Sequence, residues 1–515
     1  MLRFGFAASW ERNAEQYTGS GTGSLKELGA RFSIDTLGAN VFAALGPIES
    51  AARIMTGISS FRASLGKSVV HARNSFETTR FTAEYGVTSR LGMTLSVPLV
   101  TAVSRLDARM NPLGNEATVG FNPAYFAPLV VTSNEQLVSQ FDAAASFVNQ
   151  RLATCAAQPA ATGCAAINAN SASARALIDQ SVAFTTAMTH LYGGRPNVTG
   201  APFVPVAGGA AQAAIDARVA AFKAQFATFG AQISASSPVG GAPLTASGLQ
   251  TVLTDSVYRI IAQPLGSVVR RGVGDIDLSA QYTWHDSYAA RATATGAYRA
   301  RLWWRSAIQG TYRLGTGSAA TADALIPVST GDHQNDIEVR SLTDVGVGTA
   351  ASMTAVLRYT MQAQSTTSVR IPNAKADPFP EAFRTATVTR DPGDEMSLDL
   401  YPRWNFSEAV SVAGHYGYRS RVADSYQGSV TGATPAGTTI TSNAAVLAEG
   451  TEAHEHRVGA ILAYSAMAAW KRGRSKWPVE VSIAHFQTTA GSGGTVPKLA
   501  YDEINVRVYW RPFGR

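Results

Sequence analysis

Apolar and polar residues alternate strictly along many segments of the chain. In RLGMTLSVPLV, residues 90–100, the apolar positions are Leu91, Met93, Leu95, Val97 and Leu99. The positions between them hold Gly, Thr, Ser and Pro. A period of two predicts a β-strand with one apolar face and one small or polar face. The apolar face of such a strand meets a protein core in a soluble sandwich and lipid in an outer-membrane barrel.

The same alternation recurs in about 14 segments on both sides of a central region of different character. We predict strands at residues 2–10, 27–37, 60–72, 75–86, 90–104, 273–285, 296–314, 335–347, 351–364, 394–404, 409–422, 453–466, 477–488 and 500–512. Three apolar rows end in Trp284, Trp404 and Trp510, as an aromatic girdle at a membrane interface requires.

The connections between these segments alternate in length. Residues 86–90 and 405–408 are tight turns, whereas 315–334, 365–393 and 423–452 are long and rich in small and polar residues. Short periplasmic turns and long external loops are typical of outer-membrane barrels. If the first strand runs outward, an even number of strands leaves both termini in the periplasm and the central region outside.

The central region, residues 106–270, predicts a helical insert. Residues 134–153, 174–192 and 213–233 repeat apolar side chains at intervals of three and four, and residues 249–261 form a weaker fourth helix. We therefore divide the chain into barrel strands at 1–105, the insert at 106–270, and the remaining strands at 271–515. The insert can cap the pore mouth, plug the lumen or bind a partner protein, and the pattern does not choose between these.

The composition also favours a barrel. Charged residues make up 15% of the chain and apolar residues 45%, whereas ordinary globular proteins carry roughly 25% charged residues. No segment offers about 18 consecutive apolar residues, which excludes a transmembrane helix. In a soluble sandwich or propeller, Lys and Glu would cover the outer faces, but here the polar faces use Ser, Thr, Gly and Asn. The net charge of +7 is scattered without a basic run, so nucleic acid is not a predicted partner.

Cys155 and Cys164 are the two cysteines of the chain, and they lie close together in sequence. Two cysteines without a matching pair of histidines favour a disulfide in an oxidising compartment over a zinc site. The first strand follows at once on Met1, without the charged and apolar regions of a signal peptide. Export to the outer membrane is therefore inferred from the strands.

One row of side chains identifies the face that lines the lumen. In YRARLWWRS the first face holds Arg299, Arg301, Trp303 and Arg305, and the second holds Ala300, Leu302 and Trp304. An arginine facing lipid at mid-membrane costs about 2–4 kcal/mol, so the arginine face is predicted to be the lumen.

Other charged residues fall on predicted lumen faces. The candidates for a selectivity zone are Arg340, Arg358, Asp399, Arg403, Glu503 and Arg507, in addition to the row above. One interpretation is a structural ladder of arginine–carboxylate pairs that fills a narrow lumen. The other is a zone that prefers anionic or aromatic-acid solutes, because rings of arginine favour anions.

Catalytic and metal chemistry is not indicated. His454 and His456 lie on one side of a strand, but a third metal ligand cannot be identified. No nucleophile, base and orienting group can be linked, and no glycine-rich phosphate loop follows a strand. We therefore predict no catalytic residue, no metal and no cofactor.

Four stretches carry a resemblance to a known family. They are EYGVTSRLGMTLSVPLV (84–100), GVGDIDLSAQYTW (272–284), YRLGTGS (312–318) and PGDEMSLDLYPRWNFSE (392–408). Their order and spacing resemble the outer-membrane barrels of the family called meta-pathway of phenol degradation, which is related to the long-chain fatty-acid channels. The resemblance covers about half of the chain and none of the insert. It implies a barrel of a dozen or more strands that passes small hydrophobic or aromatic compounds across the outer membrane.

The sequence therefore predicts an all-β transmembrane protein, an antiparallel outer-membrane barrel of about 14 strands (about 12 to 16) with an α-helical extracellular insert. Its predicted function is passive diffusion of a small hydrophobic or aromatic solute through the lipid bilayer of the outer membrane. The alternatives are a surface barrel whose insert binds a protein partner and, less favoured, an enzyme at the barrel rim.

Overall fold

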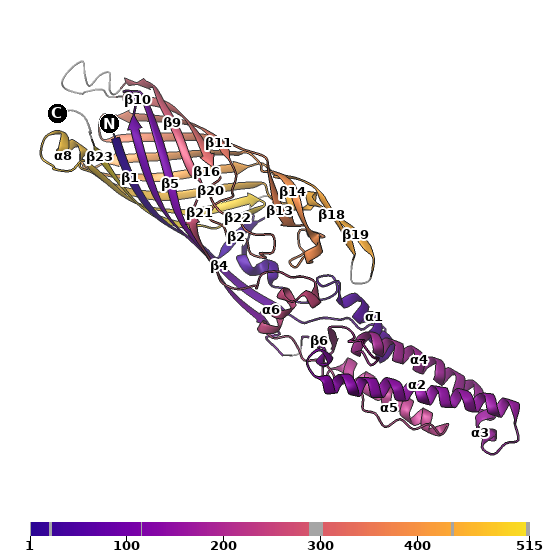
Figure 1. Cartoon of the computed structure of the whole chain (residues 1–515). Helices are drawn as coiled ribbons and strands as arrows, with labels where there is room; N and C mark the ends of the chain where they lie inside the picture. Colours follow the sequence, from indigo (N-terminus) through magenta and orange to yellow (C-terminus); the bar gives the residue numbers. More distant parts are fainter. Residues whose placement is uncertain (1, 20–22, 115, 288–301, 434–436, 511–515) are drawn as a thin grey trace.

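Twelve strands form a closed antiparallel barrel in the computed structural model, which describes residues 2–19, 23–114, 116–287, 302–433 and 437–510 (Figure 1). The barrel closes because the first strand pairs with both the second and the last strand of the wall. In barrel order the strands are β1 (Leu2–Asn13), β4 (Ser68–Gly86), β5 (Leu91–Met110), β9 (Ile276–Asp286), β10 (Leu302–Leu314), β11 (Asp336–Val347), β12 (Ala351–Gln362), β15 (Glu395–Asn405), β16 (Val410–Arg421), β20 (Ala453–Ser465), β21 (Val479–Gly493) and β23 (Ala500–Trp510). A further strand, β8 (Val268–Val273), pairs with the part of β5 from Leu99 to Ser104. The next strand in sequence, β9, pairs with the part of β5 from Leu91 to Ser96.

The outer face of the wall is apolar. On β5, the strand of the RLGMTLSVPLV segment, Met93 is 55% exposed, Leu95 42% and Leu99 46%, whereas Ser96 and Pro98 are buried on the inner side. Large exposed apolar side chains recur at alternate positions on the other barrel strands. The predicted alternation is therefore confirmed: the Leu/Met/Val face of this segment points away from the barrel interior.

Two rows of exposed aromatic side chains bound this apolar belt. We call the end where β1 begins and β23 ends the proximal end, and the opposite end the distal end (Figure 1). The proximal row holds Trp284, Trp304, Trp404 and Trp510, and the distal row holds Tyr312, Tyr359 and Tyr416. On β10 the rows are eight residues apart (304 to 312), which spans about 20 Å across a membrane at a tilt of about 40°.

Two of the fourteen predicted strands are wrong. Residues 27–37 contain the end of β3 (Ser24–Glu27) and the 3-10 helix η1 (Leu28–Phe32), and residues 60–67 form no strand before β4 begins at Ser68. Their apolar residues Phe32, Leu37, Phe61 and Leu65 are buried in a helical core rather than exposed on a barrel wall. The number of strands therefore falls at the lower limit of the expected range.

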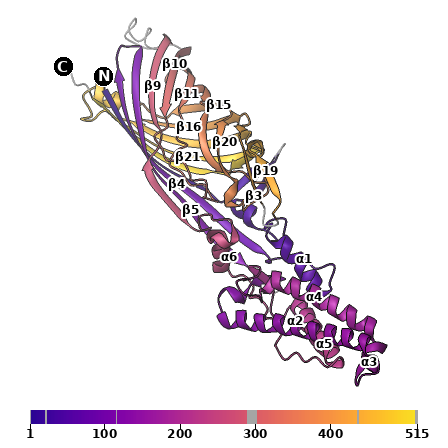
Figure 2. The same cartoon turned by 45° about the vertical axis from the view of Figure 1, so that its right-hand side comes forward.

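The helices form a unit that lies beyond the distal end of the barrel, where β4 and β5 project past the other strands (Figures 1 and 2). It comprises α1 (Leu45–Thr56), α2 (Pro128–Ala157), α3 (Cys164–Ala169), α4 (Ser171–Tyr192), α5 (Ala210–Thr228) and α6 (Ala246–Thr254). The helices expected at 134–153 and 174–192 lie within α2 and α4, although Phe147 and Val182 of their apolar stripes are exposed. Those expected at 213–233 and 249–261 overlap α5 and α6, which end earlier, at Thr228 and Thr254. Helix α1 precedes the predicted insert and packs against α4 and α5 in the same core.

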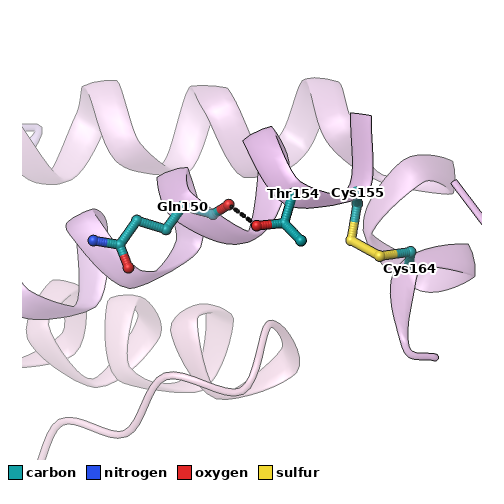
Figure 3. The surroundings of a disulfide bond; sticks show 4 residues. All are labelled: Gln150, Thr154, Cys155 and Cys164. Carbon is teal, nitrogen blue, oxygen red and sulfur yellow. Dashed lines mark hydrogen bonds between the residues drawn. A yellow bond between two sulfur atoms is a disulfide. The ribbon is translucent and has the colours of Figure 1, made fainter. Parts of the chain in front are cut away.

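The disulfide between Cys155 and Cys164 is confirmed, with an S–S distance of 2.04 Å (Figure 3). Cys155 lies in the last turn of α2, and Cys164 begins α3. The hydroxyl of Thr154, the residue before Cys155, donates to the carbonyl oxygen of Gln150 over 3.0 Å. The bond ties the connection between these two helices at the tip of the helical unit.

Connections at the two ends of the barrel differ in structure. The proximal connections include the short turns at residues 87–90 and 406–409 and the segment that holds α8 (Met467–Lys471). The long distal connections fold into small sheets: β2 (Glu15–Thr18) with β3 and β22 (Thr495–Pro497), β13 (Ser365–Arg370) with β14 (Thr385–Asp391) and β17 (Ser425–Gln427), β18 (Ser429–Ala433) with β19 (Thr439–Asn443), and β6 (Val119–Phe121) with β7 (Phe203–Pro205). Within the described ranges, no helix is both long and apolar enough to cross a membrane.

Arginine substitutions on the outer face test how deep in the membrane each position of the apolar belt lies. We expect Leu357→Arg, at the middle of β12, to cost about 2–4 kcal/mol of unfolding free energy in lipid vesicles. Met361→Arg is the matched control, because it lies on the same face of the same strand near the distal end and should cost about 0–1 kcal/mol. Equal costs for the two variants, measured by urea titration, would contradict the assignment of the belt.

Candidate functional site: the barrel lumen

The inner face of the barrel carries ion pairs between arginine and carboxylate side chains. Arg305 Nη2 lies 2.7 Å from Asp344 Oδ2, and these residues are directly paired across β10 and β11. Arg313 Nε lies 2.9 Å from Asp277 Oδ1 across β10 and β9. Similar pairs join Arg3 to Glu84, Arg340 to Glu338, Arg419 to Glu395 and Arg457 to Glu455. Arginine and acid thus alternate around the inner wall, so their charges largely cancel.

The structure places the residues of the predicted selectivity zone as follows. Trp303 and Arg305 lie on the inward face of β10, where Trp303 Nε1 donates to the Gly348 carbonyl over 2.8 Å. Arg299 and Arg301 lie outside the described residues. Arg340 contacts Glu338, Arg358 contacts Asp399, and Glu503 accepts a hydrogen bond from Tyr501. Arg403 and Arg507 share the inward rows of Asp399 and Glu503, and no ion pair involves either of them within the described ranges.

The outward face of β10 is apolar in its described part, from Leu302 onward. Leu302 is 61% exposed and Trp304 is 38% exposed on the membrane side. The Trp304 ring stacks on His285 at 3.7 Å between centroids and meets Trp284 edge-on at 5.4 Å. Ala300, the third expected member of this face, lies outside the described residues.

Four rings form an aromatic row across the inner wall. The row consists of Tyr401 on β15, His415 on β16, Phe486 on β21 and Tyr501 on β23. The centroid of His415 lies 4.8 Å from that of Tyr401 and 4.9 Å from that of Phe486. Phe486 lies 5.4 Å from Tyr501. The spacing and tilt of these rings match favourable aromatic contacts.

A glycine allows the aromatic row to cross the intervening strand, β20. Gly459 is paired with His415 on one side and with Phe486 on the other. A Cβ atom at Gly459 would lie 2.4 Å from the Phe486 ring. Only glycine therefore leaves the space in which His415 and Phe486 meet.

His415 and Asp399 form a pair that the sequence analysis missed. His415 Nε2 lies 2.8 Å from Asp399 Oδ1, and Arg358 Nη1 lies 3.3 Å from Asp399 Oδ2. Both His415 and Asp399 are largely shielded from solvent. The alternation placed Asp399 on the lumen face, but only the pairing of β15 with β16 brings the histidine to it. One signal was available: Gly417, two residues beyond His415, lies opposite Asp399 and leaves room for both side chains.

These residues border a lumen cavity of about 210 Å³. Its wall contains Arg358, Asp399, His415, Arg419, Glu455 and Arg457, together with Glu338, Thr360, Glu395, Ser397, Gly417 and Tyr418. Charges of both signs and hydroxyl groups line the cavity, so it suits water and small polar groups. The aromatic row adds apolar surface on the same side of the barrel.

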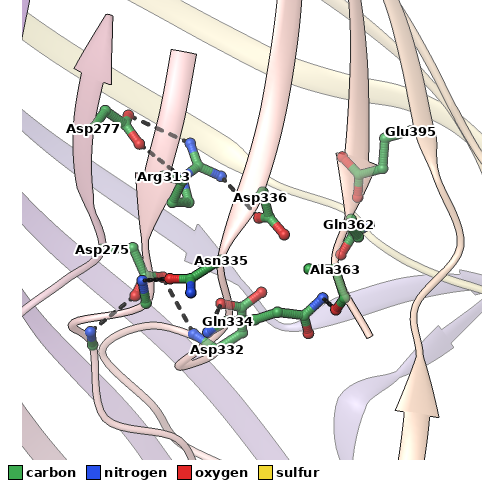
Figure 4. Close-up of polar contacts among 12 residues, drawn as sticks. Asp275, Asp277, Arg313, Asp332, Gln334, Asn335, Asp336, Gln362, Ala363 and Glu395 are labelled. Carbon is green, nitrogen blue, oxygen red and sulfur yellow. Dashed lines mark hydrogen bonds and ion pairs between the residues drawn. The ribbon is translucent and has the colours of Figure 1, made fainter. Parts of the chain in front are cut away.

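A loop between β10 and β11 is held against the distal part of the lumen wall (Figure 4). The Asp275 carboxylate accepts hydrogen bonds from the backbone N–H groups of Gly317, over 2.8 Å, and Asp332, over 3.3 Å. A Cβ atom on Gly317 or Gly331 would lie within 3 Å of that carboxylate, so these two positions need glycine. We call residues 315–335 the latch loop. Partial burial, and then the neighbouring Asp275 carboxylate, raise the pKa of Asp332, whose side chain keeps some contact with solvent.

The strand histidines do not form a metal site. His456 Nδ1 lies 2.9 Å from the Tyr416 hydroxyl and His454 Nδ1 lies 3.1 Å from the Ser420 hydroxyl, whereas Glu455 bonds Arg457 and Thr488 on the inner side. In the part of the chain that the structure describes, no three His, Cys, Asp or Glu side chains are grouped as metal ligands.

A closed barrel, an apolar belt between two aromatic rows and a polar inner face define an outer-membrane β-barrel protein. The chain therefore resides in the outer membrane. No protein-family model matches the sequence, and no curated protein matches it.

Three of the solved structures that the chain matches are two channels and a translocator domain, all at low TM-scores. An outer membrane channel from Pseudomonas putida F1 has a TM-score of 0.41 and 8% identity, with 99% of this chain and 95% of that chain covered. The translocator domain of the autotransporter NalP from Neisseria meningitidis has a TM-score of 0.31 and 6% identity, with coverage of 99% and 88%. A mutant of the monoaromatic hydrocarbon channel TodX has a TM-score of 0.30 and 8% identity, with coverage of 98% and 89%.

A double-mutant cycle measures the coupling between Arg358 and Asp399, the ion pair at the lumen cavity. Asp399→Leu should cost about 1–3 kcal/mol of stability, because it leaves Arg358 without its counter-ion and His415 without its hydrogen-bond partner. Arg358→Met combined with Asp399→Leu should cost less than the sum of the single changes. Additive costs in urea titrations would show that the pair is not coupled.

The stability of the latch loop is expected to depend on pH. Because the pKa of Asp332 is raised in the folded protein, ionisation of this carboxylate weakens the loop, and protonation restores it as the pH falls from neutral through the raised pKa toward 3.8. Amide exchange of residues 315–335, corrected for its intrinsic pH dependence, should therefore slow over this range. Asp332→Asn should remove the pH dependence and keep the loop in its slow state. A dependence that persists in the variant would assign it to another group.

Proposed function

We propose that the chain is a passive channel for small hydrophobic or aromatic solutes in the outer membrane. The observation that carries this proposal is the aromatic row on the inner wall. Its His415 borders the lumen cavity, and the rings of Tyr401, Phe486 and Tyr501 continue from it along the wall. A flat solute can exchange contacts from one ring to the next, each worth about 0.5–1.5 kcal/mol. Contacts of this size slow a solute without trapping it.

The orientation follows from the lengths of the connections. The proximal end carries short turns, and the distal end carries long connections and the helical unit. Short turns face the periplasm in outer-membrane barrels, so the distal end faces the outside. In this orientation the latch loop and the helical unit lie on the extracellular side, as the proposed insert requires.

The charges of the lumen refine the proposed selectivity. Most lumen arginines are neutralised by a neighbouring carboxylate, so the wall offers no ring of free positive charge. Arg403 and Arg507, which have no ion pair within the described ranges, lie toward the proximal end. We infer that neutral aromatic compounds and aromatic acids both pass, and that these two arginines favour the acids as they leave.

A second function is supported by the helical unit. It has a continuous buried core and a surface cavity of about 820 Å³ between α2, α3, α4 and the end of α5. Phe126 and Leu129, at the start of α2, are 66% and 84% exposed. An exposed apolar pair around the start of a helix, with Phe126 two residues before α2 and Leu129 in its first turn, is typical of a contact site for a protein partner. The barrel would then serve as the anchor of a surface interaction module.

Solute flux into liposomes tests the channel. We expect the full chain to pass benzoate and phenol faster than acyclic compounds of similar size. Phe486→Ala should remove this preference, because it interrupts the aromatic row. Phe406→Ala is the matched control, since Phe406 lies 74% exposed at a proximal turn.

The outcomes separate the two functions. Loss of the aromatic preference in Phe486→Ala alone supports the channel. A folded, membrane-inserted protein without flux of any solute contradicts the channel and leaves the anchor role.

A further inference from the structure

Four arginines form a cluster on the outer face of the barrel, at the distal edge of the apolar belt. They are Arg12 on β1, Arg73 on β4, Arg105 on β5 and Arg271 on β8, and we call them the outer arginine patch. All four are exposed. Their strands are neighbours, in the order β1, β4, β5 and β8. The patch therefore extends over four adjacent strands of the wall.

The pairing of the strands fixes the direction of these side chains. On β4 and β5 the intervening residues Ala72, Ala102 and Ser104 are buried on the inner side. Arg73 and Arg105 alternate with these residues and therefore point outward. Arg12 shares its face with Phe6, which is 40% exposed, and Arg271 shares its face with Val269 and Val273, which are 54% and 40% exposed.

The patch lies where the apolar belt ends. On the outer face of β5, Met93, Leu95 and Leu99 give way to Thr101, Val103 and Arg105 toward the distal end. Arg271 is paired with Thr101, one step beyond Leu99. Arg105, paired with Arg73, lies six residues beyond Leu99, about 15 Å further out at the same tilt. In lipid, the patch therefore extends from the edge of the acyl chains outward through the headgroups.

The charge of the patch is not neutralised by the protein. Within the described ranges, none of the four arginines takes part in an ion pair, in contrast to most arginines of the lumen. Arg73 and Arg105 are direct cross-strand partners on the same face. Like charges in such a pair repel, so this arrangement favours an anion between them. Two acids lie on the same face beside the patch: Glu77 on β4, and Asp107 on β5, whose carboxylate pairs with Arg109 over 3.2 Å.

We propose that the outer arginine patch binds the phosphate groups of a phosphorylated glycolipid of the outer leaflet. Guanidinium groups bind phosphate oxygens in bidentate geometry, and four of them at headgroup depth match a lipid with more than one phosphate. The acyl chains of that lipid would lie on the exposed apolar side chains below the patch. The inference uses the proposed orientation of the barrel and is independent of which solute the lumen passes.

Retention of lipid A by the full chain in detergent tests the proposal, with native mass spectrometry as the readout. We expect the protein to retain bisphosphorylated lipid A and to retain dephosphorylated lipid A much more weakly. Arg73→Gln with Arg105→Gln should weaken retention of the phosphorylated lipid about 30-fold, from about 1 kcal/mol for each arginine near a phosphate.

Matched variants keep the test interpretable. Arg90→Gln with Arg474→Gln removes two exposed arginines at the proximal end and should leave retention unchanged. Arg73→Lys with Arg105→Lys keeps the charge and should restore part of the binding, because lysine cannot form the bidentate contact. Solute flux through the lumen should be unchanged in all three double variants, which shows that each is folded.

Three results would overturn the proposal. One is equal retention of phosphorylated and dephosphorylated lipid A by the unmodified protein. The other is an equal loss of retention in the distal and proximal double variants. Equal retention of phosphatidylglycerol would likewise refute a glycolipid site, since a single phosphate would then suffice.

Discussion

The structure depends on the pairing of its first strand with its last. Within a lipid bilayer no water is present to satisfy an open sheet edge, so each backbone N–H and C=O group of the wall needs a partner in the next strand. β1 meets this requirement on both of its edges, from Leu2 to Arg12 against β23 and from Leu2 to Asn13 against β4. Once the sheet is closed, every strand has one face toward lipid and one toward the lumen. The belt, the ion pairs and the aromatic row all follow from this separation.

Arginine has two different environments in this barrel. In the lumen most arginines lie beside a carboxylate on the same or the next strand, which lowers the cost of holding charge in a confined space. On the outer face, arginines appear only past the distal edge of the belt among the described β4 and β5 positions. There Arg109 pairs with Asp107, whereas Arg73 and Arg105 take part in no ion pair within the described ranges. We infer that the membrane supplies the counter-charge at the outer arginine patch, as the protein does inside.

Much of the barrel could be predicted because its constraint is local. The period of two assigns the faces of β5, β10 and β12 from single segments, and the structure agrees at Leu95, Trp304 and Leu357. The same rule failed at residues 27–37 and 60–67, because a buried loop can also alternate. Helix α1 was missed since its core partners, α4 and α5, are more than 100 residues away in sequence. The contact of His415 with Asp399, and the aromatic row, depend on the register between strands, which no single segment contains.

Closure of the barrel can be measured directly by disulfide cross-linking between its first and last strands. Phe6 and Val506 are direct partners on the outer face of β1 and β23. We expect Phe6→Cys with Val506→Cys to form a disulfide in the assembled protein in the outer membrane, because paired positions bring the Cα atoms within reach of a disulfide. Phe6→Cys with Ile504→Cys, two residues out of register, should form it far less. Equal cross-linking in the two variants, or none in either, would contradict a closed barrel with this register.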